Sequence, residues 1–218
     1  MKKLIICFLG IFFLAGCSQE EACYSCDENV DAYVKENLEA IQQMNRADII
    51  KYPNEMQRAM YRSLSAEKKK EIWQDKFLQL NSLDLSDGER ELMKKFQEFV
   101  NTANFSVGIT DKERTYLESL REEGFTKFGW TQRFVVSAFG YLENVDRNGI
   151  IVKRDLDDVP VFTDPNTKPD CDCRWGFTCL DGPCDERPKS CILDDDDDYG
   201  CGWFLVQKCT GVCRPDLG

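Results

Sequence analysis

The sequence predicts an α-helical N-terminal domain of about five or six helices, followed by a small disulfide-rich C-terminal module that contains a β-hairpin. Between Asp27 and Glu143, apolar residues recur at three- and four-residue steps, which is the pattern of helices with one buried face. After residue 170 cysteines replace this pattern, and eight of them lie in residues 171–218. The two parts of the chain are therefore expected to be stabilised in different ways.

Residues 1–16 have the form of a lipoprotein signal peptide. Two lysines follow Met1, and an apolar run extends from Leu4 to Leu14, which is shorter than the about 20 residues of a permanent bilayer span. The run ends in Leu14-Ala15-Gly16-Cys17, which resembles the lipobox of bacterial lipoproteins, whose cysteine is acylated. We therefore expect a lipid such as palmitate on Cys17. An ordinary secretory signal peptide is the alternative.

Residues 17–26 are predicted to form an acidic tether between this lipid and the folded protein. Glu20 and Glu21 follow the cysteine and loosely resemble the surface-export signal of Bacteroidetes lipoproteins, so we expect a lipid-anchored protein on the surface of the bacterial outer membrane. Cys23 and Cys26 lie in this tether with C-x2-C spacing. Because no strand pattern precedes them, a local disulfide or bridges into the helical domain are favoured over a thioredoxin-like redox site.

The charge and the residue types exclude several classes of function. The net charge is −11, and there is no basic stripe to neutralise phosphates, so a nucleic-acid partner is not expected. The chain has no histidine, which removes the commonest general base and zinc ligand. It also lacks a Gly-rich phosphate loop and a serine nucleophile elbow. We expect a protein that is not an enzyme and has no catalytic residues, with paired carboxylates as the remaining enzymatic alternative.

The helical domain is assigned to residues 27–143. The predicted helices are one from Val30 to Met44, one after Pro53, one capped by Ser65, one opening with the capping box Ser86-Asp87-Gly88-Glu89, one opening with Thr110-Asp111-Lys112-Glu113 and ending at Gly124, and one from Trp130 to Leu142. The aromatic and methionine residues at helical spacing are expected to form a packed core rather than to line a ligand cavity.

Residues 144–170 are predicted to be a linker. Arg147-Asn148-Gly149 indicates a turn, residues 150–152 a short strand, and three prolines between 160 and 169 preclude a continuous helix. Lys153-Arg154 would be open to a trypsin-like protease if the linker is exposed. Cleavage there is a hypothesis for releasing the C-terminal part.

The C-terminal module is assigned to residues 171–218, and its cysteines are predicted to form disulfides. Ten cysteines remain after Cys7 is removed with the signal peptide and Cys17 is acylated, which is an even number. They are Cys23, Cys26, Cys171, Cys173, Cys179, Cys184, Cys191, Cys201, Cys209 and Cys213. The sequence leaves their pairing open, and zinc bound by two sets of thiolates is a less favoured alternative. Trp203–Val206 has strand-forming residues, and Cys191–Leu193 is the candidate partner strand.

Five consecutive aspartates, Asp194, Asp195, Asp196, Asp197 and Asp198, lie in this module. No frame of a helix–loop–helix calcium loop fits them, because neither Leu205 nor Val206 supplies the carboxylate needed at the twelfth position. The favoured interpretation is a solvated hairpin tip flanked by Cys191 and Cys201, which could contact a cationic partner. A weak calcium site using two or three of the aspartates is the alternative, and no other cofactor is expected.

Finally, the lipobox, the helical middle, the segment CDCRWGFTC at residues 171–179 and the ending CTGVC at residues 209–213 resemble the bacteriocin fulvocin C-related proteins of Bacteroidetes. The resemblance is most specific between Cys171 and Cys213. It implies a surface-anchored lipoprotein whose disulfide-stapled, bacteriocin-like module serves interbacterial antagonism or binds a protein or glycan target. A precursor whose tail is released by proteolysis, and a plain envelope-binding lipoprotein without toxicity, are the alternatives. Ten acidic residues against five basic ones in residues 171–218 favour such a target over direct lysis of anionic membranes.

Overall fold

A computed structural model describes residues 22–25, 27–152, 170–171, 184–186, 199–209 and 211–213. These residues form eight α-helices followed by short antiparallel strands, which confirms the predicted helical domain and hairpin-containing C-terminal part. The helices are α1 (Glu28–Glu36), α2 (Leu38–Gln43), α3 (Arg46–Ile49), α4 (Asn54–Ser63), α5 (Ala66–Asn81), α6 (Asp87–Thr102), α7 (Asp111–Phe128) and α8 (Gln132–Phe139).

Local capping fixes the beginnings of the long helices where the sequence predicts them. Ser65 caps α5 through Lys68 N. Ser86 and Thr110 form complete capping boxes with Glu89 and Glu113 at the starts of α6 and α7. In each box the hydroxyl and the carboxylate satisfy main-chain N–H groups that have no partner within the helix.

Two predicted helix boundaries were wrong. The helix expected from Val30 to Met44 is divided at Asn37, whose side-chain amide donates to Tyr33 O at 2.8 Å and whose backbone leaves the helical conformation. Gly124 does not end α7. A Cβ there would lie 2.4 Å from the Trp130 ring, so the glycine permits close packing, and the helix ends instead at Gly129 with φ of 65°.

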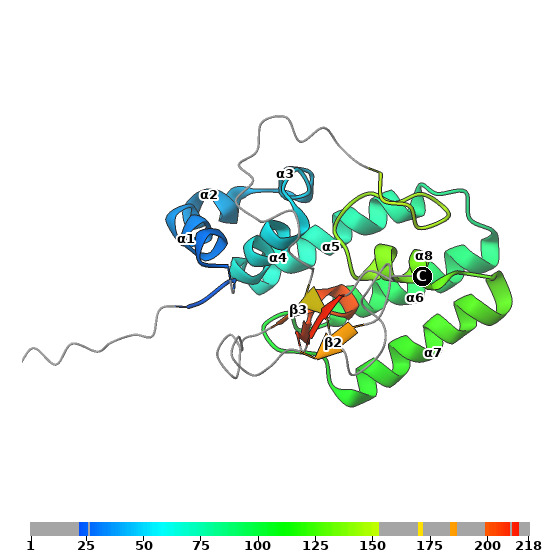
Figure 1. Cartoon of the computed structure of the whole chain (residues 1–218). Coiled ribbons are helices and arrows are strands. Elements are labelled where there is room, and N and C mark those ends of the chain that lie inside the picture. Colours follow the sequence, from blue (N-terminus) through cyan, green and yellow to red (C-terminus); the bar gives the residue numbers. More distant parts are fainter. Residues whose placement is uncertain are drawn as a thin grey trace, which may run out of the picture.

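The helices enclose one apolar core to which the C-terminal residues also contribute. α5 packs against α6, α6 against α7, and α1 against α4. The buried cluster contains Trp73, Phe77 and Phe96 from these helices together with residues 203–206, and this confirms that the helix-spaced aromatics are core. In Figure 1 the short strands of the C-terminal part lie between α4 and α7.

The strands form two small antiparallel sheets among the residues that the structure describes. One has the order β1 (Asp170–Cys171), β5 (Gly211–Cys213) and β2 (Cys184–Glu186), and the other pairs β3 (Tyr199–Cys201) with β4 (Gln207–Lys208). The strand predicted at Trp203–Val206 was wrong, because residues 203–205 form the 3₁₀ helix η3 (Trp203–Leu205). Its predicted partner, Cys191–Leu193, lies outside the described residues.

The predicted linker does not begin at residue 144. Val145 is buried and forms an isolated bridge with Ile151, inside the segment predicted as a strand. Ser137 Oγ on α8 donates to Gly149 O at 2.9 Å, so residues 144–152 belong to the helical domain. Residues 153–169, with the proposed cleavage site, lie outside the described part.

Within the described ranges, every helix is too short or too polar to cross a lipid bilayer. The segment predicted as a signal peptide lies outside those ranges.

Candidate functional site

The candidate site is a disulfide-closed loop that inserts into the helical domain. We call residues 199–209 the anchor loop. It begins with β3 and ends just after β4, and a disulfide joins Cys201 to Cys209 with 5.2 Å between their Cα atoms. This bond confirms the predicted oxidation of these two cysteines and supplies the pairing that the sequence left open.

The tip of the anchor loop is buried among helix side chains. Trp203 and Phe204 have no exposed surface, and Leu205 and Val206 are almost as buried. The Trp203 ring stacks on Phe96 of α6 at a centroid distance of 5.6 Å, and the Phe204 ring meets Trp73 of α5 edge-on at 5.0 Å. Aromatic pairs in these geometries add to the large free energy gained by removing the rings from water.

The backbone of the tip is strained. Phe204 and Leu205 are two consecutive non-glycine residues with φ of 53° and 56°, a conformation that costs on the order of 1–3 kcal/mol per residue. Gly202, at φ of 66°, precedes them, and a Cβ on it would lie 1.9 Å from Gln207 Oε1. That Oε1 atom accepts a hydrogen bond from Trp203 N at 2.7 Å. The turn therefore requires glycine at 202 and the burial of the two aromatic rings to offset its strain.

The buried carbonyl at the tip has two donors. Phe204 O accepts from Tyr61 Oη at 3.1 Å and from Trp73 Nε1 at 2.9 Å. A buried carbonyl without a partner costs about 1–3 kcal/mol, so these contacts are part of what holds the strained turn. Burial raises the pKa of Tyr61 well above its ordinary value, so the hydroxyl remains a donor.

Two arginines on one face of α4 contact the disulfide. Arg58 Nη1 lies 3.3 Å from Cys201 Sγ and also donates to Gly200 O, and Arg62 Nη2 lies 3.2 Å from Cys209 Sγ. Their spacing of four residues places both on one side of the helix. Cys201 is fully buried and Cys209 is half-buried, so the two residues differ in their exposure to solvent.

The anchor loop also reaches α7. Trp203 Nε1 donates to Glu118 Oε1 at 3.1 Å, and Glu118 is paired with Arg121 at 2.7 Å. Together with the contacts to α4, α5 and α6, this connects the loop to four helices. The helical domain and the anchor loop thus form one packed unit.

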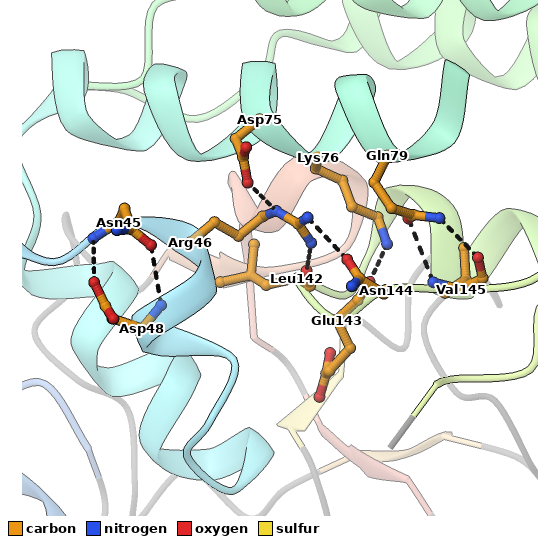
Figure 2. A network of polar contacts seen from close by, with 10 residues as sticks. All are labelled: Asn45, Arg46, Asp48, Asp75, Lys76, Gln79, Leu142, Glu143, Asn144 and Val145. Carbon is orange, nitrogen blue, oxygen red and sulfur yellow. Dashed lines mark hydrogen bonds and ion pairs between the residues drawn. The ribbon is translucent and has the colours of Figure 1, made fainter. Parts of the chain in front are cut away.

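A separate polar network holds residues 142–145 against α3 and α5 (Figure 2). Arg46 donates to Leu142 O at 2.6 Å and pairs with Asp75, Lys76 Nζ donates to Glu143 O, and Gln79 exchanges two hydrogen bonds with the backbone of Val145. Burial, and then the Arg46 guanidinium, lower the pKa of the fully buried Lys76 to about 7 against the opposing effect of Glu143. Because these donors serve backbone carbonyls inside the fold, we interpret the network as structural.

Most of the other predicted site residues lie outside the described part of the chain. These are Cys17, Cys26, Cys173, Cys179, Cys191 and Asp194 to Asp198. The backbone of Cys184 is opposite that of Cys213 in the β2–β5 pair, and Cys171 is opposite Gly211. No group of metal-ligating side chains gathers among the residues with described positions.

The disulfide predicted for Cys23 is not present, because its thiol is free and exposed. Its Sγ donates to Ser25 O at 3.3 Å. Partial desolvation and the neighbouring Asp31 carboxylate raise the pKa of this thiol, which makes it less reactive at neutral pH.

The sequence interpretation missed Arg58 and Arg62, which are both buried although they carry charge. Their signal is weak. They alternate with Met56 and Met60 on a helix of which most residues are buried, and distant partners, among them Tyr24 O and two sulfurs more than 140 positions away, are brought to them only by the fold.

Comparison of the chain with protein-family models, with curated proteins and with solved structures found no match.

Proposed function

We propose that this protein is a lipoprotein of the bacterial outer membrane whose helical domain holds a disulfide-rich, bacteriocin-like module at the cell surface for antagonism of other bacteria or for binding a protein or glycan target. The observation that carries the proposal is the insertion of Trp203 and Phe204 into the helical core next to the Cys201–Cys209 disulfide. The lipobox at residues 14–17 and the resemblance of residues 171–213 to the fulvocin C-related proteins support it.

In this proposal, the helical domain holds the C-terminal module rigidly for its target. The anchor loop contacts four helices, so residues 199–209 of the module are held in a fixed position on the helical domain. Binding by a pre-ordered surface loses less conformational entropy than binding by a flexible tail. This arrangement favours a receptor-binding role over a peptide that acts alone.

The buried anchor also bears on the precursor alternative. Cutting the chain between residues 153 and 169 would leave the anchor loop packed in the helical core. We expect trypsin-nicked protein with intact disulfides to elute as one species in native gel filtration and to separate into two chains only in denaturant. Separation without denaturant would favour the released-toxin alternative.

Lipid attachment is tested by growing a Bacteroidetes host that expresses the chain with radiolabelled palmitate. We expect label on the wild-type protein and none on Cys17→Ser, with protease treatment of intact cells removing the wild-type protein from their surface. Cys7→Ser is the matched control and should keep the label. Label on Cys17→Ser, or protection from protease, would contradict the proposed anchor or its surface exposure.

The activity is tested with the oxidised chain from residue 18 onward, because the isolated tail would lack the core that holds its anchor loop. Purified protein is applied to a panel of Bacteroidetes strains, and both growth inhibition and saturable binding to intact cells are measured. We expect binding that is weakened when Asp194 to Asp198 are replaced by asparagine. Growth inhibition would support antagonism, and binding without inhibition would support the plain binding lipoprotein. The absence of both inhibition and binding would overturn the proposal.

A further inference from the structure

The Cys201–Cys209 disulfide has an electrostatic environment that favours its reduced form. Arg58 and Arg62 each place a guanidinium nitrogen within 3.3 Å of one sulfur. A disulfide sulfur is a weak hydrogen-bond acceptor, whereas a thiolate is a strong one and carries a full charge. Guanidinium groups in these positions therefore stabilise the two thiolates more than they stabilise the disulfide.

The two sulfurs also differ in a way that gives exchange a direction. Cys209 is half-buried and Cys201 is fully buried, so an incoming thiolate meets Cys209 Sγ first. The sulfur that would leave is then Cys201 Sγ, which lies beside Arg58. Exchange is fast when the leaving thiolate is stabilised, so the more accessible sulfur is the target and the buried one is the better leaving group.

Closure of the loop by the disulfide offsets the strain at its tip. Phe204 and Leu205 hold positive φ angles, and the ring that confines them joins residues separated by 8 positions. Opening this ring restores conformational freedom, which favours the unfolded loop in the chain-entropy account. Reduction therefore weakens the packing of Trp203 and Phe204 against the helices.

We propose that Cys201–Cys209 is a redox latch, which a dithiol of the thioredoxin-like class opens so that the anchor loop leaves the helical core. A donor thiolate attacks Cys209 Sγ, the S–S bond breaks, and its electron pair leaves on Cys201 Sγ. The second donor thiol, after losing its proton, attacks the donor sulfur of the mixed disulfide and expels Cys209 as a thiolate. The donor ends as a disulfide, and the protein has gained two electrons.

The first experiment measures the reduction equilibrium of this bond in the full chain from residue 18 onward. The protein is equilibrated in dithiothreitol buffers of graded potential, quenched with acid and alkylated, and the reduced fraction at Cys201 and Cys209 is read by peptide mass spectrometry. We expect Arg58→Gln/Arg62→Gln to lower the equilibrium constant for reduction at least tenfold, which is about 30 mV for a two-electron couple. Arg58→Lys/Arg62→Lys keeps both cations and should lie between the two.

Arg46→Gln is the matched control, because it removes a buried arginine whose contacts are Asp75, Leu142 and Asn144 rather than sulfur. It should leave the equilibrium constant within twofold of wild type. An equal shift in this control, or no shift in the double variant, would overturn the role of Arg58 and Arg62. Helix content from far-UV circular dichroism establishes that each variant is folded.

The second experiment tests the direction of attack and the release of the loop. After brief exposure to glutathione and an acid quench, adducts should be found on Cys209 and not on Cys201. Reduction of the bond should then raise hydrogen exchange of the amides of residues 203–206 at least tenfold, while α6 keeps its protection. Adducts mainly on Cys201, or a loop that stays protected after reduction, would contradict the latch.

Discussion

Residues 142–145 and the anchor loop both pack against α5, but different interactions hold them there. The first segment is held by side-chain donors from Arg46, Lys76 and Gln79 that reach backbone groups (Figure 2). The anchor loop is held mainly by Trp203 and Phe204, whose rings are completely buried. Hydrogen bonds fix individual peptide groups because they are directional, whereas apolar burial is strong but fixes direction poorly.

The difference explains why one segment has a covalent closure and the other has none. In the first segment, the carbonyls of Leu142 and Glu143 and both backbone groups of Val145 have side-chain partners, which set its register against α5. In the anchor loop, hydrogen bonds also fix Phe204 O and Gly200 O, but two consecutive residues of the turn are in a strained conformation. The disulfide adds a covalent restraint to this strained turn.

The largest expected effect on stability comes from the apolar side chains that hold the anchor loop. Phe204→Ala should lower the free energy of unfolding by about 3–5 kcal/mol, measured by urea denaturation of the oxidised protein. Because Phe204 has φ of 53°, Phe204→Gly should be at least as stable as Phe204→Ala, which reverses the usual order. Leu78→Ala is the control, since that side chain is 69% exposed, and a comparable loss there would refute the assignment of the anchor.

A smaller loss of stability is expected when a hydrogen bond that holds residues 142–145 is removed. Gln79→Leu keeps the apolar stem but leaves the N–H and the carbonyl of Val145 without their partner, which should cost about 1–3 kcal/mol of unfolding free energy. Gln74→Leu removes only exposed contacts with Asn101 and should change it by about 0.5 kcal/mol or less. If both variants lose the same stability, the polar network does not hold residues 142–145.

The smallest effect concerns the pH dependence of stability at Lys76. Its folded pKa of about 7 is below its unfolded value of 10.5, so the unfolded state binds more protons between these values and stability rises with pH there. From pH 7 to pH 8 this group should contribute about 1 kcal/mol of rise, and Lys76→Met should lose it. The check is the wild-type minus variant difference in urea unfolding free energy, and a difference independent of pH would show that folding does not lower the pKa of Lys76.

The sequence predicts the parts of this fold that depend on neighbouring residues. The starts of α5, α6 and α7 follow from Ser65, Ser86 and Thr110, because a cap and its partner lie within one turn. The predicted end of α7 was wrong because Gly124 does not terminate the helix. A glycine is needed there so that the Trp130 ring can pack closely against it. Residues 203–206 have strand-forming side chains, yet burial against α5 and α6 imposes a strained 3₁₀ turn on them.

The candidate site shows the same division between local and distant causes. The even number of cysteines predicts disulfides, but counting cannot tell that Cys201 pairs with Cys209, nor that helix α4 supplies an arginine to each sulfur. These facts depend on two segments that meet only in the folded chain. The proposed lipid site at Cys17 depends on a contiguous four-residue pattern, and for that reason it could be proposed without a fold.

The position of the anchor loop in the chain has a consequence for the timing of folding. Trp73 and Phe77 of α5 find their aromatic partner Phe204 only after more than 120 further residues have been made. Contacts at such sequence separation form late, because a long stretch of chain must be ordered first. A nascent chain that has not yet reached residue 203 therefore leaves the centre of its helices incomplete. Such a chain keeps an incompletely packed core until residues 203–206 have been made.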